Sequence, residues 1–163
     1  MDHFDSERMR DEAEIKNLSH RYALALDRSD FDEWRQLFTQ DSVWQTAGRP
    51  AFTGLDEIMD VPRRLHSTFR NTFHAVLTQV IQFGASETTG VVYCAAHHLF
   101  DYDFVSPGRD PVGMSYQFLM RYEDVYSKDD RRWKFAARKL IMVTRQIEQI
   151  VQFSPGGTWS AVT

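Results

Sequence analysis

Four long segments typical of β-strands, joined only by short turns, occupy the second half of the chain. Strand-forming residues fill the ranges 71–83, 88–105, 113–126 and 131–147. The breaks between these segments hold residues that favour turns: Gly84 with Ser86, Pro107 with Gly108, and residues 127–130. Because a short turn joins strands that run in opposite directions, these segments predict a large, mostly antiparallel sheet.

The first part of the chain predicts helices. An amphipathic helix is expected from about residue 11, because apolar residues recur there at three- and four-residue steps: Ile15, Leu18, Tyr22 and Leu26. Its last turn is apolar on every side, so this end of the helix should be buried. Asp27 follows directly, but strict helical rotation places it off the apolar stripe. The periodicity therefore leaves open whether Asp27 points inward or acts as an exposed cap.

Two further helices are predicted before the sheet. Asp30 fits an N-cap position with Glu33 three residues later, which is the arrangement of a capping box. A third helix should open at Thr53 or Gly54, and Pro62 is expected to interrupt or kink it.

Helices followed by antiparallel strands define an α+β fold class. Together with a short strand expected at residues 41–46, the early helices should wrap a long, curved sheet. The result is a half-open, cone-shaped α+β barrel whose mouth is a natural pocket. A chain of 163 residues suits a single domain over 1–163, with a core of about 10–147 and an irregular tail at 154–163.

Composition narrows the classes of function. Lys and Arg number 19 against 23 for Asp and Glu, and no basic stripe stands out, so no nucleic-acid partner is expected. No apolar run approaches the roughly 20 residues that span a bilayer, so no membrane partner is expected either. The polar N-terminus and the single cysteine predict a cytoplasmic protein. That cysteine, Cys94, is a candidate nucleophile, but its apolar neighbours favour a buried core thiol.

Strand alternation distinguishes two adjacent histidines. His98 shares a strand face with apolar side chains such as Val92 and Cys94, whereas His97 falls on the wetter face. Residues on opposite faces of a strand do not readily chelate one ion, so no metal site is predicted. His98 fits either a functional site or a satisfied structural position. The histidines without a visible partner are assigned to the surface: His3, His20 and His66.

Asp27 and His74 form the most informative pair of polar residues. His74 sits early in a strand-like run, Asn71-Thr-Phe-His-Ala-Val. A carboxylate that contacts an imidazole orients the ring, fixes its tautomer and makes it a better general base. Taken alone, Asp27 reads as a cap and His74 as a structural histidine. The pair points to proton transfer only if both side chains meet inside a cavity.

Four pieces of the sequence, within roughly residues 10–147, resemble the SnoaL-like branch of the nuclear transport factor 2-like superfamily. They are the helix end Ala25-Leu26-Asp27-Arg28, Trp44 after Asp41, His74 at a strand start, and Asp130-Arg-Arg-Trp-Lys-Phe135. Within this superfamily the chain is most similar to the scytalone dehydratase and hexachlorocyclohexane dehydrochlorinase group. The resemblance implies a cystatin-like, nuclear transport factor 2-like fold in which Asp27 holds His74 as the base.

The resemblance also implies further site residues. Scytalone dehydratase has a second histidine eight residues after a glycine, and Gly90 and His98 have that spacing. The implied catalytic residues are therefore Asp27, His74 and His98. The tyrosine that precedes the aspartate of the dehydratase is Leu26 here, so another tyrosine would have to polarise a carbonyl. The residues expected to bind substrate are Tyr22, Trp44, Tyr102, Tyr116 and Phe118, although Trp44 also fits a core position.

Two functions are compatible with this resemblance. The first is a lyase of dehydratase or dehydrohalogenase type, or an isomerase, that takes a proton from a small hydrophobic or cyclic substrate without a cofactor. The alternative is a non-catalytic ligand-binding or subunit module, such as a ring-hydroxylating dioxygenase β-subunit. Because relatives form dimers or trimers, a homodimer or homotrimer is expected, and the sheet face that carries Tyr93, Ala95 and Leu99 is one candidate for its interface.

Overall fold

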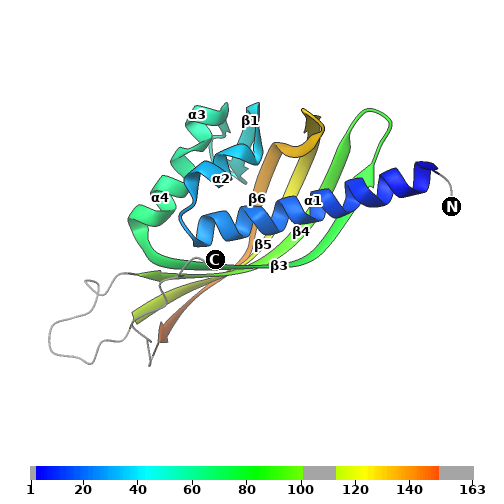
Figure 1. Cartoon of the computed structure of the whole chain (residues 1–163). Coiled ribbons are helices and arrows are strands. Elements are labelled where there is room, and N and C mark those ends of the chain that lie inside the picture. Colours follow the sequence, from blue (N-terminus) through cyan, green and yellow to red (C-terminus); the bar gives the residue numbers. More distant parts are fainter. Residues whose placement is uncertain (1–2, 101–112, 151–163) are drawn as a thin grey trace, which may run out of the picture.

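The computed structural model describes residues 3–100 and 113–150. The helices are α1 (His3–Asp27), α2 (Phe31–Gln36), α3 (Leu55–Ile58) and α4 (Asp60–Thr68). The strands are β1 (Phe38–Thr46), β2 (Phe52–Thr53), β3 (Phe69–Phe83), β4 (Thr88–Phe100), β5 (Gly113–Asp129) and β6 (Arg132–Ile150). In this part of the chain the strands form one sheet, ordered β2-β1-β6-β5-β4-β3. Only the β1–β6 pair is parallel among these neighbours. The helices lie on one side of the curved sheet (Figure 1), so the α+β prediction is confirmed.

Helix α1 is longer than the sequence pattern predicts, because it begins at His3 rather than near residue 11. The apolar residues that defined the pattern are buried against the sheet, with Ile15, Leu18 and Tyr22 at most 3 % exposed. Once these residues hold the helix, each additional residue gains a backbone hydrogen bond at low cost, so polar residues extend it. No helix in the described ranges is both long enough and apolar enough to cross a membrane.

The short helices begin close to the residues that the sequence predicts, with two differences. Asp30 caps α2, because its carboxylate accepts a hydrogen bond from the Glu33 N–H at 3.0 Å. The Glu33 side chain does not complete a capping box, since it accepts from Arg21 Nε on α1 at 2.6 Å. The interruption predicted at Pro62 falls earlier, at the break between Ile58 and the start of α4. Pro62 lies in the first turn of α4, where a helix needs no backbone donor.

The register between β3 and β4 brings two histidines onto the same face of the sheet. Thr72 pairs with His98, and His74 pairs with Ala96. His74 and His98 are therefore diagonal neighbours, close enough for ring contact. The continuation of the β4 prediction from 101 to 105 lies outside the described residues.

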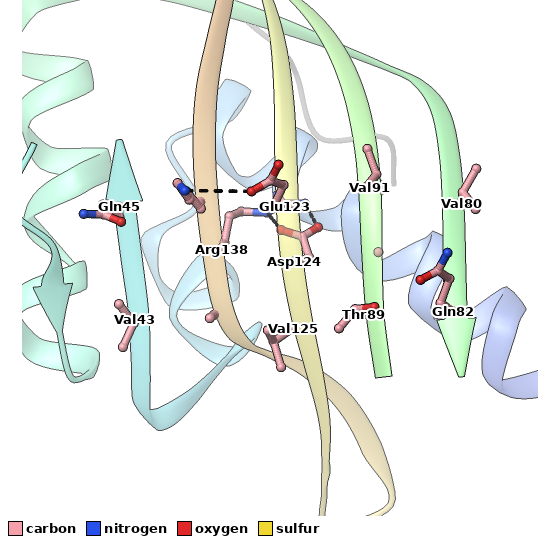
Figure 2. Close-up of a pocket in the computed structure, with 13 residues that line it drawn as sticks. Val43, Gln45, Val80, Gln82, Thr89, Val91, Glu123, Asp124, Val125 and Arg138 are labelled. Atoms are coloured by element: carbon pink, nitrogen blue, oxygen red, sulfur yellow. Dashed lines mark hydrogen bonds and ion pairs between the residues drawn. The ribbon is translucent and has the colours of Figure 1, made fainter. Parts of the chain in front are cut away.

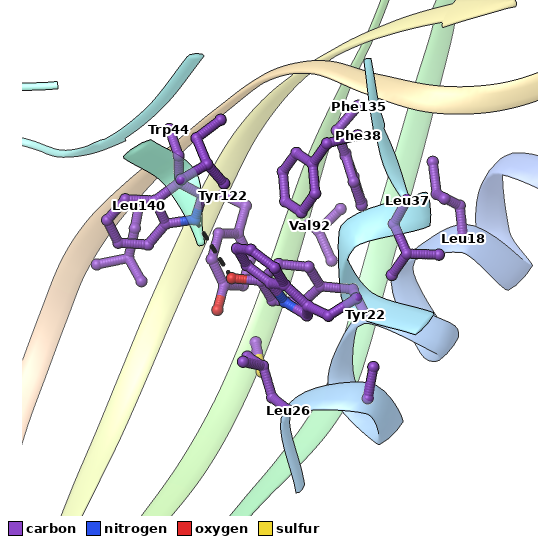
Figure 3. Close-up of a cluster of buried hydrophobic side chains, with 14 of the residues drawn as sticks. Leu18, Tyr22, Leu26, Leu37, Phe38, Trp44, Val92, Tyr122, Phe135 and Leu140 are labelled. Carbon is purple, nitrogen blue, oxygen red and sulfur yellow. Dashed lines mark hydrogen bonds between the residues drawn. The ribbon is translucent and has the colours of Figure 1, made fainter. Parts of the chain in front are cut away.

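A buried arginine lies in the core on the helix side of the sheet. Arg138 is 1 % exposed and donates two hydrogen bonds to the Asp124 carboxylate, at 2.9 and 2.8 Å. Its guanidinium carbon lies 4.2 Å from the ring centres of Tyr22 and Tyr122, and 4.0 Å from that of Phe135. Burial opposes the charge, but the Asp124 carboxylate raises the pKa of Arg138 above its ordinary value. The aromatic rings around this cation belong to the buried hydrophobic cluster between the helices and the sheet (Figure 3).

The outer face of the sheet, away from the helices, is partly apolar. The outer-face patch consists of Phe73, Val80, Val91, Tyr93 and Leu119, which are all at least 38 % exposed. A shallow hollow of about 510 Å³ lies across the strands on this side (Figure 2). Of the residues predicted for self-association, Tyr93 is exposed, whereas Ala95 and Leu99 are half-buried.

Candidate active site

The C-terminal end of α1 brings Asp27 against strand β3. The Thr72 hydroxyl donates to Asp27 Oδ1 at 2.9 Å, and the His74 backbone N–H donates to Oδ2 at 2.9 Å. His74 Nδ1 lies 2.6 Å from Asp27 Oδ1. The side chains of Asp27 and His74 are only 6 % and 4 % exposed. Asp27 therefore points inward, and the exposed-cap alternative is excluded.

These hydrogen bonds determine the tautomers of two histidines. Because a carboxylate only accepts, His74 Nδ1 carries the proton and donates it to Asp27. Nε2 of neutral His74 then has a free lone pair, and His98 Nε2 lies 3.2 Å from it. A hydrogen bond at that position requires the proton on His98 Nε2. Hydrogen bonds thus run from His98 through His74 to Asp27, with a basic nitrogen in the middle.

His98 is uncharged at neutral pH. Burial first, and then the neighbouring His74, lowers the pKa of His98 from 6.5 to about 3. Its ring packs between Phe69 and Phe118, with centre-to-centre distances of 4.8 and 4.9 Å. Its Nδ1 has no hydrogen-bond partner in the described part of the chain. His98 can therefore donate a hydrogen bond through Nε2–H, but it does not act as an imidazolium at pH 7.

A cavity of about 700 Å³ opens on the helix side of the sheet beside the Asp27–His74 pair. Its buried wall residues include His74, His98, Tyr22, Trp44, Met120 and Tyr122. Exposed residues from the β1–β2 turn and from α4, such as Arg49 and Arg64, mark its mouth. A mostly apolar cavity of this size fits a small cyclic molecule.

Two of the residues expected to bind substrate line this cavity, Tyr22 and Trp44. Trp44 Nε1 donates a hydrogen bond to the Tyr22 hydroxyl oxygen at 3.3 Å (Figure 3). Since the indole can only donate, the Tyr22 O–H is left to donate elsewhere. Burial, opposed in part by Arg138, raises the pKa of Tyr22 and keeps that proton in place. Tyr22 is thus positioned to donate a hydrogen bond into the cavity.

Two of the other expected substrate contacts are not in the cavity wall. Tyr116 and Phe118 do not line the cavity. Phe118 packs against the His98 ring, and Tyr116 lies next to Phe118 with their ring centres 5.7 Å apart. Alternation identified the correct face of β5 but not the position along the strand at which the cavity ends. Tyr102 lies outside the described residues. A substrate-binding role for these three residues stays a prediction.

Sequence reasoning missed two residues at this site. Thr72 lies two positions before the candidate base, so strand alternation could have identified it. His66 was assigned to the surface, but its Nε2 lies 2.7 Å from the Leu26 carbonyl oxygen and its Nδ1 lies 3.2 Å from Ser29 Oγ. These contacts of His66 connect α4 to the C-terminal end of α1. A contact between residues 40 positions apart leaves no periodic signal in a sequence.

Strand β4 carries two other residues that could be reactive, His97 and Cys94. His97 is exposed on the outer face, whereas His98 is 7 % exposed on the inner face. Within residues 3–100 and 113–150, no group of three or more His, Cys, Asp or Glu side chains is arranged to hold a metal ion. Cys94 is buried, and burial raises its pKa to about 12. The interpretation of Cys94 as a core thiol is confirmed.

Comparison with known proteins identifies a family and a shared fold. Residues 7–139 match the SnoaL-like domain family, and no curated protein matches the chain. A hexachlorocyclohexane dehydrochlorinase, LinA type 2, is similar in structure with a TM-score of 0.79 and 17 % identity, over 94 % of this chain and 99 % of that one. A scytalone dehydratase-like protein of Novosphingobium aromaticivorans has a TM-score of 0.75 and 21 % identity, over 96 % and 99 % of the two chains.

A protein from Nostoc punctiforme described as having a cystatin-like fold is also similar. Its TM-score is 0.62 and its identity 19 %, over 81 % of this chain and 90 % of that one. At such low identities the likeness shows the fold, and the predicted cystatin-like, nuclear transport factor 2-like architecture is confirmed. The family match covers most of the described residues. The chain therefore belongs to the SnoaL-like domain family.

Proposed function

We propose that the protein is a lyase of dehydratase or dehydrohalogenase type, or an isomerase, in which His74 takes a proton from a small cyclic substrate without a cofactor. One observation carries the proposal: His74 lines an apolar cavity while Asp27 holds its other ring nitrogen at 2.6 Å. Two similar folds belong to a dehydrochlorinase and a scytalone dehydratase-like protein, which supports this class of reaction.

The proposed base is Nε2 of His74. When Nε2 removes a proton from a substrate C–H bond, the ring becomes an imidazolium that stays bonded to the Asp27 carboxylate. The negative charge stabilises the imidazolium, and the hydrogen bond from Thr72 holds the carboxylate in position. A positioned base of this kind contributes about 10²–10⁴-fold to a rate. The apolar wall excludes water and strengthens these electrostatic interactions.

Elimination follows from the movement of two electron pairs. The electrons of the C–H bond form the new double bond, and the leaving group on the adjacent carbon departs with its own bonding pair. A halide leaves as an anion, whereas a hydroxyl needs a proton, which the His74 imidazolium can return. Returning that proton to a different carbon would give an isomerisation instead.

His98 and Tyr22 are proposed as hydrogen-bond donors rather than acids. With a pKa of about 3, His98 carries no extra proton to transfer at neutral pH. When a bound substrate replaces the His98–His74 hydrogen bond, the His74 lone pair is free to take a proton, and the His98 Nε2–H can steady negative charge that develops on the substrate or leaving group. The O–H of Tyr22 can do the same, because the hydrogen bond from Trp44 uses only the oxygen of this hydroxyl as an acceptor.

The first test is hydrogen exchange in D₂O. A panel of cyclic β-hydroxy ketones and chlorinated cyclohexanes would be incubated with the protein, and NMR would follow both deuterium uptake and product formation. We expect exchange or elimination for at least one compound, and loss of about 10²–10⁴-fold in His74→Ala because the base is removed. His97→Ala is the matched control, since that neighbouring histidine is exposed on the outer face.

Equal turnover by His74→Ala and the wild-type protein would exclude this mechanism. If the wild-type protein gave neither exchange nor product with any compound, the non-catalytic alternative would be favoured, and a pull-down from the native host would then look for an iron-containing partner subunit. Circular dichroism of both variants would show that the fold is retained.

A further inference from the structure

The mouth of the candidate cavity is cationic. Among the described residues that line the cavity, the only ones with a permanently charged side chain are Arg49 and Arg64, and no aspartate or glutamate is present. The chain as a whole has a net charge of −4. The Asp27 carboxylate lies behind this lining, where it is already bonded to His74 and Thr72. A lining whose fixed charges are positive therefore indicates a preference for ligands of the opposite sign.

Hydrogen bonds fix the backbone of Arg49, and its side chain is available to bind a ligand. It lies in the turn between β1 and β2, where its N–H donates to the Thr46 carbonyl oxygen at 3.0 Å. Its own carbonyl oxygen accepts a hydrogen bond from Gln45 Nε2 at 2.9 Å. Within residues 3–100 and 113–150 its guanidinium has no hydrogen bond or ion pair, so its donors are available to a ligand.

Arg64 approaches the mouth from α4. Its guanidinium carbon lies 5.3 Å from the ring centre of Phe52, which also lines the cavity. Stacking on that ring holds the cation at the opening. Its partner Asp60 is 3.6 Å away and is shared with Arg63, at 3.4 Å. One carboxylate between two arginines leaves positive charge uncompensated.

We propose that the cavity binds substrates composed of an apolar ring system and one anionic group, of which a carboxylate is the simplest. The rings lie against the apolar wall near His74, and the anion lies at the mouth between Arg49 and Arg64. This inference rests on the proposed function, because it assigns the substrate class of the same site.

The chemistry of the groups favours this orientation. A guanidinium presents paired N–H donors that match the two oxygens of a carboxylate. A ligand that fills the apolar cavity also excludes water from its mouth, which strengthens the attraction between the charges. With the anion at the mouth, the buried Nε2 of His74 is left to act on a C–H bond of the ring system.

Binding of two matched probes tests the inference. Isothermal titration calorimetry would compare 2-naphthoate with 2-naphthamide, which have the same rings and differ in charge. We expect 2-naphthoate to bind the wild-type protein about tenfold more tightly, the effect of roughly one charge-assisted hydrogen bond at a partly exposed site. In the double variant Arg49→Gln/Arg64→Gln this preference should fall below about twofold, with little change for the amide.

Arg63→Gln is the matched control, because Arg63 shares Asp60 with Arg64 but does not line the cavity. It should keep the preference for 2-naphthoate. The inference is overturned if 2-naphthoate does not bind, if both probes bind equally, or if the double variant keeps the preference. Thermal unfolding of each variant would establish that it is folded.

The same probes separate this inference from the proposed function. His74→Ala should keep the preference for 2-naphthoate, because the mouth is unchanged, while it loses hydrogen exchange. If the preference is present but exchange survives in His74→Ala, the proposed function fails. If exchange depends on His74 but the preference is absent, only the assignment of an anionic substrate fails.

Discussion

At the scale of single residues, the site depends on how one carboxylate distributes its hydrogen bonds. Asp27 accepts from the Thr72 hydroxyl, from the His74 backbone and from the His74 ring. All three donors belong to residues of β3, and the Thr72 hydroxyl and the His74 backbone N–H fix the carboxylate independently of the ring. The ring nitrogen that remains is the one next to His98. These contacts are the ones that the proposed role of His74 as a base requires of an aspartate at a helix end.

His98 should make the stability of the protein depend on pH. The unfolded chain protonates this histidine near pH 6.5, whereas the folded protein does so only near pH 3. Acid therefore favours the unfolded state. The contribution of uncharged His98 to the free energy of unfolding is complete above pH 6.5 and is lost as the pH falls toward 3. At pH 5 the expected loss is about 2 kcal/mol. Urea unfolding at pH 8 and pH 5 measures it.

The control for this prediction lies one residue away. His98→Gln should flatten the dependence of the unfolding free energy on pH between 5 and 8, whereas His97→Gln should leave it unchanged, because His97 is exposed. Equal slopes in His98→Gln and the wild-type protein would show that His98 titrates normally in the folded state.

At the scale of elements, the antiparallel ladder between β5 and β6 holds the floor of the cavity. The Asp124–Arg138 pair crosses this ladder (Figure 2). In the core, the Arg138 guanidinium packs against the rings of Tyr22 and Tyr122. Gly90 on the adjacent strand β4 leaves room for this arrangement. A Cβ there would lie 2.8 Å from the Tyr126 hydroxyl oxygen, and that hydroxyl donates to Asp124 at 2.9 Å.

Removing one partner of this pair should be strongly destabilising. In Arg138→Met the Asp124 carboxylate stays buried without its cation, and the free energy of unfolding should fall by about 3–5 kcal/mol. Lys139→Met is the control, because the neighbouring lysine is half exposed and its partner Glu123 lies 3.9 Å away. Urea unfolding of both variants provides the measurement. A loss below about 1 kcal/mol in Arg138→Met would mean that the core relaxes around the unpaired carboxylate.

At the scale of the whole molecule, the two faces of the sheet have different roles. The helices cover one face, on which the cavity opens, and none of the described helices lies over the opposite face (Figure 1). That opposite face carries the outer-face patch. Exposed apolar area of this kind is usually covered by another molecule. We expect a second copy of the chain to cover it, as the sequence predicted, and the oligomeric state stays a prediction.

A charge placed in the patch tests that expectation. Leu119 is 48 % exposed and lies between β4 and β6 on the outer face. Leu119→Lys should shift the sedimentation coefficient toward that of a monomer, because burying an unpaired ammonium in an apolar interface is costly. Leu24→Lys is the control, since Leu24 is 44 % exposed on α1. A wild-type protein that sediments as a monomer, or an unchanged oligomer in Leu119→Lys, would contradict the prediction.

The sequence by itself indicated most of the helices and strands and the faces of the long strands. Periodicity along a strand or helix is local, so it placed His98 inside and His97 outside, and it identified Asp30 as a cap. It also favoured a core position for Cys94. The family resemblance, carried by short motifs, singled out Asp27 and His74 as a pair.

Only the tertiary structure decided what those residues meet. The direction of Asp27 depends on donors 45 and 47 residues away. The same dependence on distant contacts explains why the sequence placed His66 on the surface and gave no sign of the buried Asp124–Arg138 pair. It also explains why the position of Arg49 and Arg64 at the mouth of the cavity could be recognised only in the folded structure. Such contacts arise when separate elements pack against each other, and no local spacing in the chain records them.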